Sequence, residues 1–371
     1  MTPATLPRPL TGHPLALHSR SNLIASCALS SVLLASVLAT SPAHGQERDE
    51  FRVCWSIYAG WMPWAYADQE GIIDKWAEEY GISIDVIQVN DYVESINQFT
   101  SGNVDGCAMT NMDALTIPAA SGVDSTALII NDYSDGNDGI VLKDSDDLAD
   151  IEGRRVNLVQ FSVSHYFLAR ALESVGLTER DIETVNTSDA DIVGLFSSDS
   201  TEAVAAWNPQ LNAIAEMPDS HVVYTSAEIP GEILDMLVVN SDTLAANPDF
   251  GHALVGAWYE VMELVAADDD AALSIMADAA GTDLDGYRAQ LEATHMYTDP
   301  ADAVELLESD DLLETMQRVA EFSFEHGLLG DMAPSPEVVG IETPSGVYGD
   351  EGNIQLRFDP SFTQAYIDSR Q

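Results

Sequence analysis

The stretch GRRVNLVQFSVSHYFLARALESVGLTERDIETVN, residues 153–186, decides the fold. It contains an apolar run, a segment whose apolar residues recur at helical spacing, and a second apolar run. GRRVNLVQ and DIETVN have the length of strands, and SHYFLARALESVG has the length of a helix. A strand, a helix and a strand in this order form a parallel pair covered by the helix. The stretch therefore predicts an α/β fold in which helices wrap a parallel-rich sheet.

The same alternation continues on both sides of this stretch. Downstream, EAVAAWN and HVVYTS extend one set of elements over residues of about 150 to 228. Upstream, FRVCWSIY, ISIDVIQV, VDGCAMT and TALIIND alternate with helical segments and form an earlier set. SDGNDGIVLKDSDDL joins the two sets, and GEILDMLVVNSDTL follows the second one. Each of these segments joins a Gly-containing turn to an extended apolar run, so the simplest connection is a second lobe inserted through two chain crossings.

The predicted organisation is therefore two-lobed. Lobe I consists of residues 46–137 and 238–371, and lobe II is the inserted segment 138–237. Residues 244–329 have helical periodicity, with apolar stripes that we assign to the core. The Pro- and Gly-rich remainder predicts a short hairpin that wraps lobe I. Two crossings between lobes predict a hinge.

Residues 1–45 have the composition of a secretory signal peptide. They contain Arg8 and Arg20, no acidic residue, an apolar run and the small-residue stretch SPAHG. We expect cleavage near Gly45, because the sequence turns abruptly acidic after it. The apolar run is also long enough for an uncleaved anchor across a thinned bilayer. Cys27 ends a lipobox-like IASC, but the apolar run follows this cysteine, so we do not predict lipidation.

The charge is strongly negative, with 62 Asp and Glu against 14 Lys and Arg. Nucleic acid and anionic membranes would be repelled, so neither is an expected partner. The acidic residues are spread through every segment, which favours a solvating surface of a halophilic kind over one functional patch. We expect a monomer.

Two cysteines follow the signal segment, Cys54 and Cys107. Both lie in apolar strand-like runs, and an exported protein permits a disulfide between them, but two buried thiols fit the sequence equally well. CxxC, HExxH and clustered histidines are absent from the sequence. We therefore expect no metal and no cofactor.

Loops after the predicted strands are the expected ligand positions, because ligands of open α/β sheets lie beyond the carboxyl ends of strands. The first such loop, within FRVCWSIYAGWMPWAYADQEG at residues 51–71, gathers an unusual number of aromatic rings around one glycine. Plain helix capping is an equal alternative for two of the carboxylates, Asp113 and Asp189, and core packing is favoured for Trp207. The candidate site residues are Trp55, Tyr58, Trp61, Trp64, Asn111, Asp113, Asp132, Asp135, Ser162, Ser164, His165, Asp189 and Trp207.

Several of these segments resemble a known family over residues of about 51 to 240. WSIYAGWMPWAYADQEG, FTSGNVDGCAMT, LADIEGRRVNLVQFSVSHYFLARALESVGL and AVAAWNP are similar to periplasmic solute-binding proteins of nitrate-, sulfonate- and taurine-type ABC importers. The crossing NDYSDGNDGIVLK and the Trp-rich loop most resemble the branch associated with urea carboxylase pathways. The resemblance implies the type II periplasmic binding protein fold, closure of two lobes around urea or guanidine, delivery to a membrane permease, and a periplasmic location.

The same fold also occurs in proteins that make a thiamine pyrimidine with a cysteine-rich iron motif and a sacrificial histidine. This chain lacks such a cysteine cluster, and it has no phosphate loop or nucleophile triad in the expected context. His165 alone of its eight histidines lies in a predicted ligand loop, where polar contact is favoured over catalysis. We therefore predict a binding protein with no catalytic residues, not an enzyme.

The distribution of basic residues separates the possible ligands. No Lys or Arg occurs in residues 76–142 or in residues 181–287, which hold most of the candidate loops. A sulfonate or nitrate would then depend on helix N-termini alone. Aromatic rings and carboxylates suit a planar cation instead. We therefore expect guanidine or urea, with Trp61 as a wall and Asp132 and Asp135 as the first carboxylates. A sulfonate, taurine or nitrate binder and a thiamine-pyrimidine protein are the alternatives.

Overall fold

A computed structural model of the chain describes residues 48–371, except 199 and 331–332. The predicted signal peptide lies outside the described residues. No helix within the described ranges is both long and apolar enough to cross a membrane.

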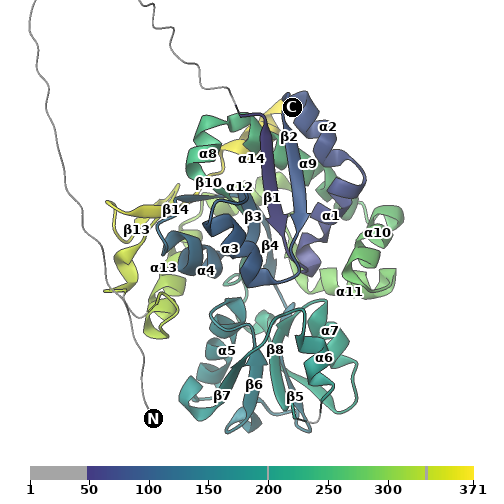
Figure 1. The fold of residues 1–371 in the computed structure, drawn as a ribbon, viewed down its shortest axis with the longest axis vertical. Coiled ribbons are helices and arrows are strands. Elements are labelled where there is room, and N and C mark those ends of the chain that lie inside the picture. Colours follow the sequence, from purple (N-terminus) through teal and green to yellow (C-terminus); the bar gives the residue numbers. More distant parts are fainter. Residues whose placement is uncertain (1–47, 199, 331–332) are drawn as a thin grey trace, which may run out of the picture. The chain divides into compact units, whose positions relative to one another are not determined.

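The larger sheet has nine strands among the described residues, in the order β13-β12-β14-β4-β10-β3-β1-β2, with β11 paired to β4 (Figure 1). Strands β1 to β3 and the pairs that β14 forms are parallel, whereas β10 runs antiparallel to both β3 and β4. Its strands are β1 Glu50–Trp55, β2 Ser83–Gln88, β3 Gly106–Thr110, β4 Ser125–Ser134, β10 Leu234–Asn240, β11 Thr294–Met296, β12 Gly340–Thr343, β13 Gly346–Tyr348 and β14 Ile354–Phe358.

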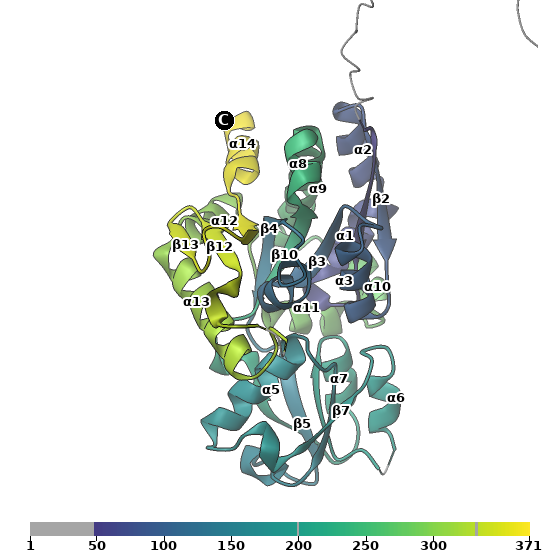
Figure 2. The same ribbon diagram turned by 60° about the vertical axis from the view of Figure 1, so that its left-hand side comes forward.

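The smaller sheet has the order β7-β6-β8-β5-β9, and its strands alternate with helices as the opening stretch predicts. Figures 1 and 2 show α5 on one face of this sheet and α6 and α7 on the other, and all three helices contact β8. The elements are β5 Asp138–Lys143, β6 Arg155–Leu158, α5 Val163–Ser174, β7 Glu183–Asn186, α6 Ile192–Phe196, β8 Ala203–Trp207, α7 Gln210–Ala215 and β9 Ser220–Thr225.

Helices that precede and follow the crossings cover the larger sheet. Gly71, in the left-handed region at φ 70°, separates the first two helices, α1 and α2. Helices α1 and α2 both pack against α9, and α1 also packs against α10. These helices are α1 Met62–Gln69, α2 Ile72–Glu79, α3 Tyr92–Thr100, α4 Asn111–Ala114, α8 Ser241–Ala246, α9 Pro248–Ala266, α10 Asp270–Ala280, α11 Leu284–Glu292, α12 Pro300–Leu307, α13 Asp310–Glu325 and α14 Ser361–Ser369. Short 3-10 and π turns complete the chain, η1 to η6, of which η1 Ala59–Trp61 and η4 Glu179–Asp181 bear on the site and its surroundings.

The chain passes between the sheets at two places. It leaves β4 at Ser134 and enters β5 at Asp138, then leaves β9 at Thr225 and enters β10 at Leu234. The second passage precedes the predicted boundary at residue 237, because β10 already pairs with the larger sheet from Leu234 onward.

Cys54 and Cys107 form a disulfide between the neighbouring strands β1 and β3, with their Cα atoms 4.4 Å apart. Of the two states that the sequence left open, the structure has the bridged one.

Candidate functional site

A small cavity, with about 10 Å³ of room for the centre of a water-sized sphere, lies where loops of the two sheets meet. Most of its wall comes from the carboxyl ends of strands or the helix starts that follow them, as the sequence predicts. The remaining wall comes from the two chain crossings, at Asp138 and at Ile233 and Asp235. The lining residues are Tyr58, Trp61, Tyr92, Thr110, Asp138, Val163, Trp207, Ile233 and Asp235. The room among them is about what one water molecule needs, so in this arrangement the lining side chains nearly fill the cavity.

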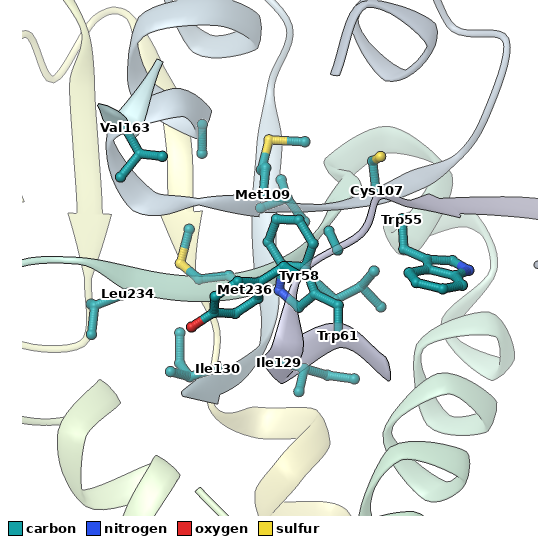
Figure 3. Close-up of a cluster of buried hydrophobic side chains, with 14 of the residues drawn as sticks. Trp55, Tyr58, Trp61, Cys107, Met109, Ile129, Ile130, Val163, Leu234 and Met236 are labelled. Carbon is teal, nitrogen blue, oxygen red and sulfur yellow. The ribbon is translucent and has the colours of Figure 1, made fainter. Parts of the chain in front are cut away.

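Four aromatic rings form a continuous wall of this cavity. Tyr58 lies edge-on to Trp61 with ring centroids 5.1 Å apart, Trp61 lies 5.7 Å from Tyr92, and Tyr92 meets Trp207 edge-on at 5.4 Å. Figure 3 shows Tyr58 and Trp61 together, whereas Trp55 lies apart from them. Trp207 donates its indole N–H to the carbonyl of Ile57 at 3.0 Å, which links the small sheet to the first loop. The rings thus form a rigid apolar slot.

Two buried carboxylates complete the wall, and a third lies directly behind it. Asp138 and Asp235 line the cavity and are 3% and 2% exposed. Asp132 is fully buried, lies opposite Asp235 in the β4–β10 register, and accepts the hydroxyl of Tyr58 at 2.8 Å. Burial raises the pKa of Asp132 and of Asp138 to about 7 in each case, although hydrogen bonds from Tyr58 and Ser134 oppose that rise. Burial and the neighbouring carboxylates raise the pKa of Asp235 well above its usual range.

The cavity wall contains no Lys, Arg or His within the described part of the chain. The three carboxylates therefore have no positive partner in the wall. Such a set of acceptors beside aromatic faces can hold a cation through charge-assisted hydrogen bonds and cation–π contacts.

Asp113 occupies a different position from the one expected of a ligand contact. Its carboxylate accepts hydrogen bonds from the hydroxyls of Tyr92 at 2.7 Å and Thr110 at 2.9 Å, and from the backbone N–H of Val163 at 3.1 Å. Val163 begins α5, so this carboxylate satisfies an N–H at the start of that helix. Burial raises the pKa of Asp113 to about 6, against the effect of these hydrogen bonds. Asp113 therefore joins the two sheets at the back of the cavity.

The structure gathers three of the thirteen candidate residues in the cavity wall: Tyr58, Trp61 and Trp207. Trp64 packs in the core instead, buried against Trp258 with ring centroids 4.9 Å apart. Trp55 is also buried but does not line the cavity. Asp135 is exposed, because it falls in the turn between β4 and β5.

The other candidates surround the cavity without lining it. Asn111 fixes the second crossing, since its side chain donates to the carbonyl of Glu232 and accepts the N–H of Leu234. Asp189 accepts the N–H of Tyr92 at 3.1 Å, which caps α3 from the small-sheet side. Ser162 caps α5, Ser164 is buried in its first turn, and His165 accepts the N–H of Phe161. Burial lowers the pKa of His165.

Sequence reasoning missed Tyr92, Asp138, Ile233 and Asp235 as wall residues and did not select Thr110 or Val163 from their predicted loops. A signal exists for the two aspartates. Asp138 stands in the acidic crossing NDYSDGNDG, and Asp235 is the one acidic residue within the apolar run ILDMLVV, residues 233–239. A charged residue entering a buried strand at a crossing marks a carboxylate that faces the gap between sheets. Tyr92 lies in the loop directly after the predicted strand ISIDVIQV, so the rule for strand ends could have selected it.

Two mixed sheets wrapped by helices, joined by two crossings and enclosing a small cavity, define the class of the molecule as a periplasmic binding protein fold. The predicted fold is thereby confirmed. The chain belongs to the NMT1/THI5-like family, whose model matches residues 65–272.

The solved structures most similar to the chain include two sulfonate-binding proteins. The alkanesulfonate-binding protein SsuA of Xanthomonas axonopodis pv. citri, solved with MOPS bound, has a TM-score of 0.65 at 16% identity, over 77% of this chain and 96% of that one. The periplasmic aliphatic sulphonate-binding protein SsuA of Escherichia coli has a TM-score of 0.63 at 16% identity, over 83% and 97% of the chains. At this identity the likeness concerns the fold.

One curated relative aligns over part of its length. The taurine-binding periplasmic protein of Escherichia coli strain K12 is 21% identical to this chain over 201 residues, which is 53% of this chain and 62% of the relative. The match thus spans less than two thirds of that protein.

Proposed function

We propose that the chain is the extracytoplasmic solute-binding component of an ABC importer and that its ligand is a small planar nitrogen-rich cation, guanidinium first and urea second. The fold, the family and the cavity between the sheets support the binding role. The Cys54–Cys107 disulfide supports a location outside the cytoplasm. A membrane permease would receive the ligand.

The observation that carries the ligand class is the composition of the cavity wall. Asp138 and Asp235 are buried there beside four aromatic rings, and the described wall has no basic side chain. Buried carboxylates without a partner are costly, and a bound cation would supply the missing charge. A guanidinium is flat, stacks on aromatic faces and donates paired hydrogen bonds to carboxylates.

A second observation disfavours an anionic ligand such as those in the relatives' names. In a pocket without basic residues, an anion would need the free N–H groups of a helix N-terminus. At the start of α5 the Asp113 carboxylate already accepts the N–H of Val163. A sulfonate or nitrate in the cavity would also face the charges of Asp138 and Asp235. The wall therefore favours a cation.

The two sheets would act as lobes that close on the ligand, with lobe II inserted near residues 138–237 and hinged at the two crossings. Contacts across the gap include the indole of Trp207 to the carbonyl of Ile57, and the N–H of Ala59 to the carbonyl of Asn208 at 3.1 Å. A ligand that touches Tyr58 on one side and Trp207 on the other stabilises the closed arrangement, because both contacts exist only there.

A thermal-shift screen in molar NaCl tests the proposal. Guanidinium should raise the melting temperature most, methylguanidine and urea less, and taurine and nitrate least, because the shift grows with the ratio of ligand concentration to Kd. A large shift with taurine or nitrate and none with guanidinium would overturn the cation assignment and favour the sulfonate-type alternative. Chemical change of a thiamine-pyrimidine precursor or of guanidinium during incubation would instead indicate an enzyme.

A further inference from the structure

We propose that the site exchanges a proton for its ligand, so that each cation bound displaces about one proton from the Asp132, Asp138 and Asp235 carboxyls to solvent. This inference rests on the proposed function. It concerns the ligand-free protein, in which protons neutralise part of the carboxylate cluster.

The geometry of the cluster requires such neutralisation. All three carboxyls are nearly or fully inaccessible to solvent. Asp132 and Asp235 occupy opposed positions of antiparallel strands, and Asp138 enters the same region from β5. Tyr58 donates to Oδ1 of Asp132, whereas Oδ2 of Asp132 is buried without a hydrogen-bond partner. Like charges this close, and out of water, disfavour simultaneous ionisation.

Gly60 brings the chain close to the cluster. A Cβ at this position would lie 2.3 Å from Oδ2 of Asp132, so only glycine allows this approach. The loop that carries Tyr58 and Trp61 is thereby packed directly on the carboxyl group and excludes water from it. Water excluded from this carboxyl group cannot solvate its negative charge.

No basic side chain of the described cavity wall compensates the negative charge of the cluster either. The titratable groups that interact with the three carboxyls are all acidic or phenolic within the described residues, and the Ser134 hydroxyl donates a neutral hydrogen bond to Asp138 at 2.7 Å. Apart from the three carboxyls, these titratable groups are Tyr58 from the first loop, Asp113 from α4, Tyr287 from α11 and Tyr297 after β11. Burial raises the pKa of Asp132 and Asp138 to about 7, which places their protons in the neutral range.

The exchange balances in charge and atoms. A protonated carboxyl of the cluster loses its proton to the buffer, and the resulting carboxylate accepts hydrogen bonds from the ligand. Guanidinium keeps its own protons, because a guanidinium group is not deprotonated in proteins. Neutral urea brings no charge, so it leaves the carboxyl protons in place.

Isothermal titration calorimetry of the full protein with guanidinium chloride tests the exchange. Titrations near pH 7 in phosphate and in Hepes, at one high NaCl concentration, give the number of protons released from the dependence of the observed heat on buffer ionisation enthalpy. We expect about one proton for guanidinium and none for urea. The affinity for guanidinium should rise up to about tenfold per pH unit below pH 7 and level off above it.

Two variants and one control locate the proton. Asp138→Asn should reduce both the proton release and the pH dependence, and Asp235→Asn serves the same purpose if the first variant does not fold. Asp124→Asn is the matched control. The Asp124 carboxylate is paired with the guanidinium of Arg357 at 2.9 Å, and neither residue lines the cavity. It should leave the proton count unchanged.

The outcomes separate this inference from the proposed function. Guanidinium binding without proton release, and with the same affinity from about pH 5.5 to pH 8, would overturn the exchange and leave the ligand assignment standing. No heat with guanidinium at any pH would overturn the ligand assignment and the exchange with it.

Discussion

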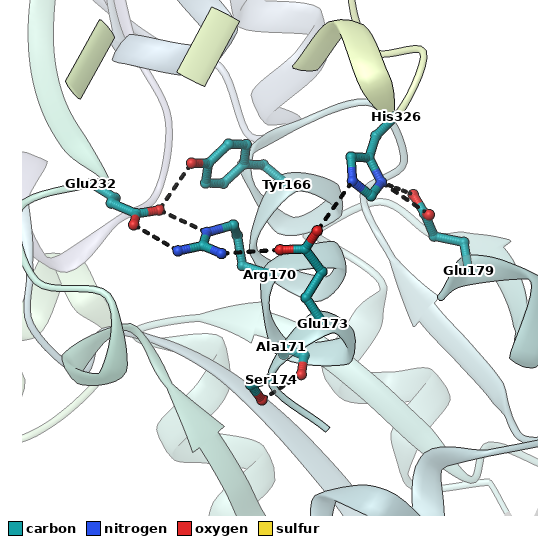
Figure 4. Close-up of polar contacts among 8 residues, drawn as sticks. All are labelled: Tyr166, Arg170, Ala171, Glu173, Ser174, Glu179, Glu232 and His326. Atoms are coloured by element: carbon teal, nitrogen blue, oxygen red, sulfur yellow. Dashed lines mark hydrogen bonds and ion pairs between the residues drawn. The ribbon is translucent and has the colours of Figure 1, made fainter. Parts of the chain in front are cut away.

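Glu232 and Asp235 belong to the same chain crossing, yet their carboxylates have opposite surroundings. Glu232 receives two hydrogen bonds from the guanidinium of Arg170, at 2.8 and 3.0 Å, and a third from the hydroxyl of Tyr166 at 2.9 Å (Figure 4). Asp235 faces the cavity among other acids. The first carboxylate has its cation within the chain, and the second has none among the residues that the structure describes.

The pKa values of the two groups follow this difference. Burial alone would raise the pKa of Glu232, but the hydrogen bonds and charge of Arg170 hold it below its ordinary value. Burial and neighbouring acids raise the pKa of Asp235. A paired carboxylate contributes to the structure, whereas an unpaired buried one costs stability unless a ligand completes it. The Arg170–Glu232 pair also shows the geometry in which this protein already holds a guanidinium group.

Removing one unpaired carboxylate should have the largest effect. Asp138→Asn should lower the affinity for guanidinium about 100-fold or more, because truncating one partner of a buried charge contact costs about 2 to 5 kcal/mol. The affinity for urea should change much less, since an amide still accepts a hydrogen bond. Calorimetry on both ligands measures this, and equal losses for the two would show that Asp138 acts through shape and not through charge.

Breaking the paired carboxylate should act on stability instead. Arg170→Met leaves Glu232 without its cation, and we expect the free energy of unfolding to fall by about 2 kcal/mol, below the range for fully buried pairs because Arg170 is partly exposed. Thermal unfolding is the suitable measurement, as guanidinium chloride contains the proposed ligand. Tyr166→Phe should cost about 1 kcal/mol. An unchanged melting temperature in Arg170→Met would contradict a stabilising role for the pair.

Trp61 and Trp64, three residues apart, allow the same comparison for aromatic rings: the first lines the cavity and the second lies in α1. Trp61→Ala should weaken guanidinium binding about tenfold, because a desolvated cation–π contact contributes about 1 to 2 kcal/mol. Trp64→Phe should lower stability but leave the affinity intact, since Trp64 packs on Trp258 in the core. An equal loss of affinity for guanidinium in Trp64→Phe and Trp61→Ala would contradict the assignment of Trp61 to the ligand site.

Without ligand, the free energy of unfolding should depend on pH in two opposite ways, one from the unpaired carboxylates and one from the paired Glu232. Asp132 and Asp138 have raised pKa values in the folded protein, so it binds more protons than the unfolded chain and loses stability as the pH rises toward 7. We expect a loss of about 2 kcal/mol per pH unit between about pH 5 and pH 7, since two groups contribute, and about half of that in Asp138→Asn. The pKa of Glu232 is lowered, so its contribution is present above about pH 4.5 and disappears as the pH falls. A melting temperature that is constant from pH 5 to pH 8 at fixed salt would contradict the buried, unpaired state.

The sequence predicted the fold well because strand and helix periodicities are local. The alternation around residues 153–186 sufficed for the smaller sheet, and two rings of the aromatic loop, Tyr58 and Trp61, line the cavity. The long segments without Lys or Arg also indicated a wall without cations.

The carboxylates were harder to predict because long-range pairing positions them. Asp235 enters the wall because β10 pairs antiparallel with β4, a contact between segments far apart in the chain. Asp135 precedes Gly136, and this Asp-Gly pair marks the turn that exposes it, whereas Asp138 begins the buried strand. Which member of an acidic segment is buried thus depends on where the strand starts.

Guanidinium and urea have nearly the same shape and differ in charge, so the ratio of their dissociation constants on the unaltered protein isolates what the unpaired carboxylates contribute. Calorimetry at neutral pH in molar NaCl should give guanidinium an affinity about 100-fold higher than urea, in line with the cost of leaving a buried charge without its partner. A ratio near one, or tighter binding of urea, taurine or nitrate, would contradict the conclusion that this cavity is built to receive a cation.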